Sequence, residues 1–145
     1  MIYTYAYPRP AVTVDMIVFK ETNSGLEFLL IERKNEPFKN QWALPGGFVD
    51  IDEEIEHAAY RELEEETSIR KIKLKQFKSF GKLGRDPRGR TISIVFYGNL
   101  KDKNQTIKAA DDAKNLQWFT LDQLPPLAFD HQEIIDQFIE KKKSS

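Results

Sequence analysis

The stretch RELEEET, from Arg61 to Thr67, carries four glutamates within five consecutive positions. It ends the segment Glu53–Thr67, which we predict to be a helix. Like charges three and four residues apart repel each other on a helix, and the helix macrodipole disfavours anions near the C-terminus. A solvated, charged helix face is one explanation, and a bound cation is the other. The stretch therefore restricts how this helix can pack.

Helical rotation of about 100° per residue places Glu62, Glu65 and Glu66 on one arc of this helix. The small and apolar residues of the same arc are Ile55, Ala58 and Ile69, with Ala59 at its edge. The far side carries Glu53, His57, Tyr60 and Glu64. We therefore expect the three glutamates to face the sheet and Glu64 to face solvent, and we assign no role to His57.

Inward carboxylates need partners, because unpaired buried charge is costly. Arg61 is the only cation near in sequence, and one cation cannot balance three anions. Oxygen ligands at positions i, i+3 and i+4 suit Mg²⁺, which commonly bridges carboxylates to substrate phosphates, and also Mn²⁺. Periodicity favours a metal site here and leaves the plain charged helix open.

Apolar and β-branched runs predict strands, and turn formers predict the connections between them. The predicted strands are Ala11–Phe19 and Leu26–Ile31 as a hairpin, then Ile72–Leu83, Thr91–Leu100 and Leu116–Phe119; 34–47 is predicted as a loop, GRDPRGR as a hairpin tip and Asp130–Lys142 as a closing amphipathic helix. Strands with two well-separated helices indicate an α+β fold in which a sheet is covered by helices.

The chain has 145 residues and a formal net charge of −1, which suits one domain, 1–145, and gives no general basic excess for nucleic acid. Its lack of cysteine excludes disulfides and thiolate metal sites and suits a reducing cytoplasm. The start MIYTYAYPRP lacks signal-peptide features, and no apolar run approaches the ~20 residues of a membrane span. We expect a cytoplasmic protein without membrane contact, and a homodimer is possible.

The spacing from Gly47 through Glu53 to Arg61–Ile69 resembles the Nudix box, G-x5-E-x7-R-E-U-x-E-E-x-G-U, where U is aliphatic. Every defining position matches except Ser68, which stands where the family has glycine. Glycine just past a helix end usually supplies a left-handed cap. Serine in that conformation would cost on the order of 1 kcal/mol, so this helix could also end differently. The flanking LPGG (residues 44–47) and Trp118–Phe119 also fit the family.

The resemblance implies a Nudix fold, an α/β/α sandwich with a mixed sheet, and a metal-dependent hydrolase of nucleoside diphosphate derivatives. It implies that Glu62, Glu65 and Glu66 bind Mg²⁺ or Mn²⁺ together with the carbonyl of Gly46. Glu53 and Arg61 are expected to orient the loop and the ligand helix. Bound metal then activates a water nucleophile, and a carboxylate can take its proton.

The loop GRDPRGR carries Arg85, Arg88 and Arg90, which could bind phosphates, although composition alone slightly favours a plain polar hairpin tip. The segments DPRGRTIS, Ala110–Ala113 and Ala128–His131 resemble Nudix proteins of NAD and ADP-ribose metabolism. The resemblance therefore favours ADP-ribose as substrate. The alternatives are a nucleoside triphosphate pyrophosphohydrolase and a non-catalytic ADP-ribose sensor, though the box carboxylates are complete and we expect no appended DNA-binding domain.

The remaining candidates each have a simpler structural explanation. Asp112 or its neighbour Asp111 could assist a metal, act as base or contact substrate, or simply form a turn. We expect Asp130 to cap the last helix and His131 to be a surface histidine of its first turn. Trp42 and Phe80 could stack on a base, and core packing is at least as good an explanation for each.

Overall fold

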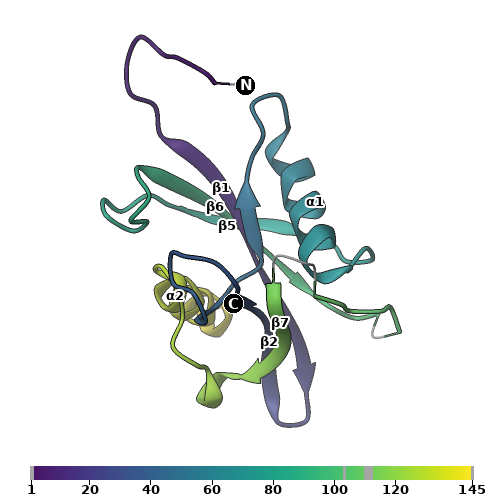
Figure 1. Cartoon of the computed structure of the whole chain (residues 1–145). Coiled ribbons are helices and arrows are strands. Elements are labelled where there is room, and N and C mark those ends of the chain that lie inside the picture. Colours follow the sequence, from purple (N-terminus) through teal and green to yellow (C-terminus); the bar gives the residue numbers. More distant parts are fainter. Residues whose placement is uncertain (1, 103, 110–112, 145) are drawn as a thin grey trace.

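The computed structural model describes residues 2–102, 104–109 and 113–144, apart from the side chains of residues 113 and 114 (Figure 1). Its elements are β1 Ala11–Thr22, β2 Gly25–Arg33, β3 Trp42–Ala43, β4 Gly46–Phe48, α1 Ile55–Thr67, β5 Lys75–Phe80, β6 Thr91–Asn99, β7 Ala113–Thr120, the 3₁₀ turn η1 Leu121–Gln123 and α2 His131–Ser144. The predicted strands and helices are confirmed with shifted bounds. The prediction of 34–47 as loop throughout is wrong, because β3 and the start of β4 lie within it.

One mixed sheet forms the centre of the fold, with the strand order β3-β2-β1-β6-β5. The strands β1 and β6 run parallel, while β1 pairs antiparallel with β2 and β4. The strand β7 pairs antiparallel with β2 along most of its length. The short β4 therefore lies against β1 near its start, at Thr13–Asp15, and a short connection leads from β4 to α1.

Two helices cover the two faces of this sheet, which confirms the predicted α+β sandwich (Figure 1). Side chains alternate between the faces along a strand, and β1 shows this directly. Val14, Met16 and Val18 pack in one core with α1, while Ile17 and Phe19 pack in a second core with α2. No helix of the described chain has both the length and the apolar character needed to cross a bilayer.

The helix α1 ends in the left-handed conformation at the position where the box has glycine. Ser68 has φ 65° and ψ 8°, and its backbone N–H donates to the Glu64 carbonyl at 2.8 Å. The serine therefore keeps the capping geometry that glycine usually supplies. A β-carbon in this conformation costs free energy, yet Ser68 still forms the capping hydrogen bond at the end of α1.

Candidate active site

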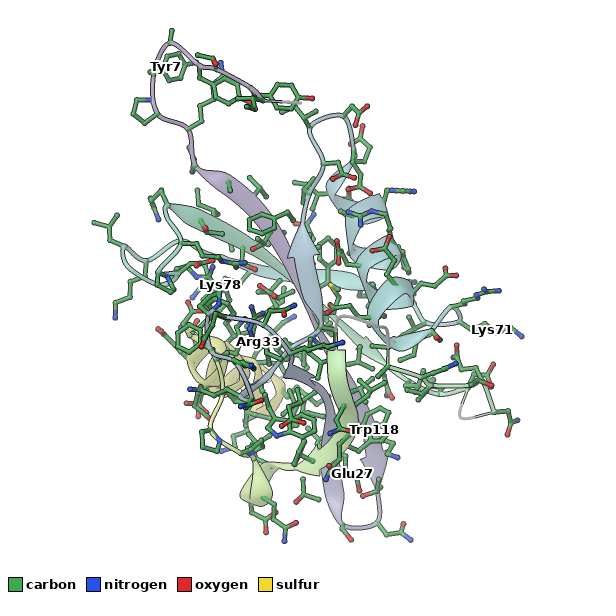
Figure 2. The ribbon with its side chains drawn as sticks, in the orientation of Figure 1. Tyr7, Glu27, Arg33, Lys71, Lys78 and Trp118 are labelled. Atoms are coloured by element: carbon green, nitrogen blue, oxygen red, sulfur yellow. The ribbon has the colours of Figure 1, made fainter. Side chains whose placement is uncertain are left out.

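A cleft of about 370 Å³ opens where β1, β2, β4 and α1 meet the 81–90 loop and the start of α2. Arg33, at the end of β2, lies near the middle of the molecule in Figure 2 and lines this cleft. The cleft residues are Thr13, Asp15, Ile31, Arg33, Lys34, Asn35, Ala43, Leu44, Gly46, Gly47, Phe48, Asp50, Glu62, Glu66, Arg85, Asp86, Arg88, Phe129 and His131. Carboxylates and guanidinium groups thus face one shared space.

The α1 glutamates do not all face inward, and the prediction for Glu65 is wrong. Glu66 is buried and the Glu62 side chain is 14% exposed, but the Glu65 side chain is 58% exposed. Leu63 and Thr67 are buried in the same helix. Their burial turns the inward arc toward Leu63 and away from Glu65. Two of the three glutamates therefore line the cleft, and the third lies at its solvent side.

Arg61 connects the α1 carboxylates to the segment that precedes the helix. Its Nε and Nη2 donate to the two Glu53 carboxylate oxygens at 2.6 and 2.8 Å. Its Nη1 donates to Glu62 at 2.8 Å and, more weakly, to Glu65 at 3.3 Å. The hydrogen bonds from Arg61 lower the pKa of Glu53 to about 2. Helix α1 begins at Ile55 rather than at residue 53, so Glu53 can turn back to meet Arg61.

Gly46 and Gly47 allow the β4 backbone to approach the acidic helix closely. The Gly46 N–H donates to Glu66 Oε1 at 2.6 Å. A β-carbon on Gly47 would lie 2.3 Å from Glu62 Oε2, and one on Gly46 would lie 2.3 Å from the Val14 carbonyl. Any larger side chain would therefore displace either the carboxylate or the strand. This close approach is the physical reason for both glycines.

The donor set fits a hard divalent cation, because Glu62, Glu65, Glu66 and the Gly46 carbonyl offer oxygen only. Within the described part of the chain, no three Asp, Glu or His side chains converge as a ready-made metal site. Arg61 Nη1 instead contacts both Glu62 and Glu65. A cation held by Glu62 and Glu65 would therefore compete with Arg61 for these two carboxylates.

The three arginines of the 81–90 loop have different positions. Arg85 is buried, and Arg88 lines the cleft with its guanidinium 5.0 Å from the Phe48 ring. Arg88 also donates to buried Asp86 at 2.8 Å, and although burial acts to raise the pKa of Asp86, the bonds from Arg88 lower it. Arg90 is exposed and donates to the Gly81 carbonyl at 2.6 Å. The loop connects β5 to β6 as predicted, but it is no plain solvated tip, because residues 85 and 86 are buried.

Arg33 is a cleft residue that the sequence prediction missed. Its Nε donates to the Pro37 carbonyl at 2.7 Å, and its guanidinium lies 5.0 Å from the Phe129 ring centre. Among the described residues it forms no ion pair. Burial and the neighbouring Arg88 lower its pKa. The nearby charges of Glu66, Asp86 and Asp15 act to raise that pKa. A partly buried cation that forms no ion pair with a described residue suits an anionic ligand. Its position at a strand end gave no distinctive sequence signal.

The predictions for the start of α2 are corrected by two buried contacts. His131 is 3% exposed, not a surface residue, and its Nδ1 accepts a hydrogen bond from the Leu44 N–H at 3.0 Å. Burial lowers its pKa despite nearby Asp15. Asp130 precedes the helix as expected, but its carboxylate accepts two hydrogen bonds from Arg85. Asp15, also missed, is buried and accepts a hydrogen bond from Ser93 Oγ.

The two aromatic candidates pack in the core. Phe80 is 6% exposed, and Trp42 makes an edge contact with Phe119 at 4.9 Å between ring centroids. Both belong to the core on the α2 side of the sheet. Asp111 and Asp112 lie outside the described residues, so their predicted roles stay predictions.

Comparison with known proteins gives the same family as the box residues. A family model for the NUDIX domain matches residues 9–140. The chain belongs to the Nudix family. The ADP-ribose pyrophosphatase of Methanocaldococcus jannaschii is 47% identical over 137 residues, covering 94% of this Nudix chain and 77% of that protein. The match and this relative place the chain among the Nudix hydrolases.

Two further relatives are a transcriptional repressor and a NUDIX domain solved with a ligand. The ADPR responsive transcriptional repressor NtrR of Acinetobacter baylyi is 40% identical, over 90% of this chain and 54% of the repressor. The NUDIX domain of Shewanella oneidensis NrtR, solved in complex with ADP ribose, aligns with a TM-score of 0.82 at 31% identity. That alignment covers 94% of this chain and 90% of the NrtR domain.

Proposed function

We propose that this Nudix protein hydrolyses the diphosphate bond of ADP-ribose to give AMP and ribose 5-phosphate, and that residues 1–145 act as one catalytic domain. One observation carries the proposal. Glu62 and Glu66 line the same cleft as Arg33 and Arg88. Carboxylates suit the metal that a diphosphate brings, and guanidinium groups suit phosphate oxygens. The names and ligands of the relatives support ADP-ribose as the particular diphosphate.

Glu62, Glu65, Glu66 and the Gly46 carbonyl would hold Mg²⁺ or Mn²⁺, which when bound neutralises the diphosphate and lowers the pKa of water. Arg61 and Glu53 orient these ligands, because Arg61 donates to Glu53, Glu62 and Glu65 together. A cleft carboxylate then takes the proton from the attacking water. No protein nucleophile is required.

Arg33 and Arg88 bind the phosphates from the other wall of the cleft. Both guanidinium groups lie near the Phe129 ring, with Arg33 at 5.0 Å and Arg88 at 5.4 Å from its centroid. Arg85 and Arg90 contribute differently from the sequence prediction, since Arg85 is paired with Asp130 and Arg90 with the Gly81 carbonyl. Of the predicted arginines, we therefore retain Arg88 as a direct substrate contact and add Arg33.

The test compares initial rates with ADP-ribose, ADP-glucose, NADH, dGTP and ATP at one Mg²⁺ or Mn²⁺ concentration, and repeats the best substrate in excess EDTA. We expect ADP-ribose to give the highest kcat/KM and the chelator to abolish turnover. A triphosphate as best substrate would refute the substrate assignment. Full activity in EDTA would refute the metal assignment.

A sensor without catalysis is the second candidate, and the similarity to the Acinetobacter repressor is the observation that favours it. The complete carboxylate set favours the enzyme, because a sensor does not need metal ligands placed for chemistry. Binding measured by calorimetry separates the two candidates. ADP-ribose that binds in the presence of Mg²⁺ and is recovered intact after long incubation would favour the sensor.

A further inference from the structure

His131 contacts the loop before β4 from a distant part of the sequence. The imidazole Nδ1 accepts a hydrogen bond from the Leu44 N–H at 3.0 Å. An acceptor Nδ1 carries no proton, so the proton of the neutral ring is on Nε2. The Nε2 atom lies 3.6 Å from Asp15 Oδ1. The ring is therefore fixed on one side by the loop and faces a buried carboxylate on the other.

Leu44 and Pro45 of this loop, and Gly46 at the start of β4, each form a hydrogen bond to a different element. Leu44 donates to His131 of α2, the Pro45 carbonyl accepts from the Met16 N–H of β1 at 2.8 Å, and the Gly46 N–H donates to Glu66 of α1 at 2.6 Å. Gly46 is also packed too tightly against β1 to admit a β-carbon. A displacement at Leu44 is therefore passed on to the Gly46 peptide and to Glu66.

We propose that His131 is a positioning residue that sets the orientation of the Gly46 peptide and of Glu66, and through them the affinity for the divalent cation. This inference rests on the proposed function, in which Gly46 and Glu66 supply metal ligands. The role needs an acceptor at the Nδ1 position and does not need an imidazole as such. Residues that orient metal ligands typically change metal affinity by about 10–100-fold when altered.

Two polar substitutions separate this role from general packing. In His131→Asn the amide oxygen, attached to Cγ like Nδ1, can accept from Leu44. In His131→Gln the amide lies one bond farther out, near the Nε2 position, so Leu44 loses its acceptor while a polar group still faces Asp15. We measure the Mn²⁺ dissociation constant by electron paramagnetic resonance on the full chain without substrate, and kcat and KM with ADP-ribose at saturating metal.

We expect His131→Gln to weaken Mn²⁺ binding by about tenfold or more. The Mn²⁺ affinity of His131→Asn should stay within about threefold of the wild type. The KM for ADP-ribose at saturating metal should change little in either variant. Equal Mn²⁺ affinity in all three proteins, or equal loss in both variants, would overturn the proposal. If neither variant folds, amide exchange of Leu44 in the wild type decides: slow exchange supports the bond, and exchange at the rate of an open loop overturns it. A wild type that binds Mn²⁺ but hydrolyses none of the substrates would sink the proposed function and leave this affinity comparison intact.

Discussion

Arg85 donates two hydrogen bonds, of 2.9 and 2.7 Å, to the carboxylate of Asp130. The Arg85 side chain is 3% exposed and that of Asp130 is 12% exposed. This pair joins the 81–90 loop to the residue that precedes α2. The same loop carries Arg88, and α2 begins with His131. The 81–90 loop, which lines the cleft, and the turn before α2 are therefore fixed to each other.

We predict that Arg85→Ala destabilises the protein by about 3 kcal/mol, because it leaves the carboxylate of Asp130, which is only 12% exposed, without its cation. The matched control is Arg90→Ala, an exposed arginine of the same loop, which should change stability by less than about 0.5 kcal/mol. Urea denaturation at neutral pH measures both. Equal stability of the two variants would show that the buried pair contributes little.

Glu66→Gln should lower turnover with ADP-ribose by about 100-fold or more, corresponding to about 3 kcal/mol of barrier, with the fold intact. Glu66 is buried, lines the cleft and accepts from Gly46, so its charge is placed for a cation. Glu64→Gln is the control, because Glu64 is exposed and pairs with Arg70 at 2.8 Å outside the cleft. Steady-state rates at saturating Mg²⁺ compare them. Near-normal turnover of the Glu66 variant would remove that residue from the metal site.

Arg88→Ala should reduce kcat/KM for ADP-ribose by the equivalent of about 1–3 kcal/mol, the value of a charged hydrogen bond. Arg90→Ala should leave kcat/KM unchanged, since Arg90 points to the Gly81 carbonyl and does not line the cleft. Because Arg88 also pairs with Asp86, the melting temperature of each variant is measured alongside. Loss of rate in both variants to the same extent would argue against a specific contact by Arg88.

The Glu53–Arg61 pair should make stability depend on acidic pH. Hydrogen bonds from Arg61 lower the pKa of Glu53 from 4.5 to about 2. A lowered carboxyl pKa stabilises the folded state above the unfolded pKa, and this contribution is lost as the pH falls toward the folded value. We expect the melting temperature of the wild type to exceed that of Glu53→Gln at about pH 5. That difference should shrink between pH 4.5 and about 2. A difference independent of pH over this window would contradict the pairing.

Ser68→Gly should stabilise the protein by up to about 1 kcal/mol, because glycine adopts the left-handed conformation without the β-carbon penalty. Ser68 Oγ donates only a long, exposed hydrogen bond to the Lys108 carbonyl, at 3.4 Å, so little is lost with the side chain. Ser68→Ala keeps the β-carbon and is the control, which should not be stabilised. Chemical denaturation of the three proteins gives the order. A glycine variant no more stable than the serine protein would mean that the turn is not strained.

Local signals in the sequence were enough to predict the longer elements and the class of chemistry. The apolar, β-branched run Ala11–Phe19 predicted a buried strand, and the structure shows its two faces in two separate cores. The fixed spacing from Gly47 to Ile69 indicated the Nudix family, and the oxygen-only ligand types indicated a hard cation. These features depend on residues that are close together in the sequence, so they can be recognised without knowing the fold.

Only the tertiary structure decided which side chains reach the cleft. Helical rotation placed Glu65 inward, but burial of Leu63 and Thr67 turned it toward solvent. His131 is buried and accepts a hydrogen bond from Leu44, which lies 87 positions earlier. Arg33 lines the cleft because β2 ends there beside the 81–90 loop. Contacts between such distant segments depend on how the sheet and helices pack, and no local pattern in the sequence records that packing.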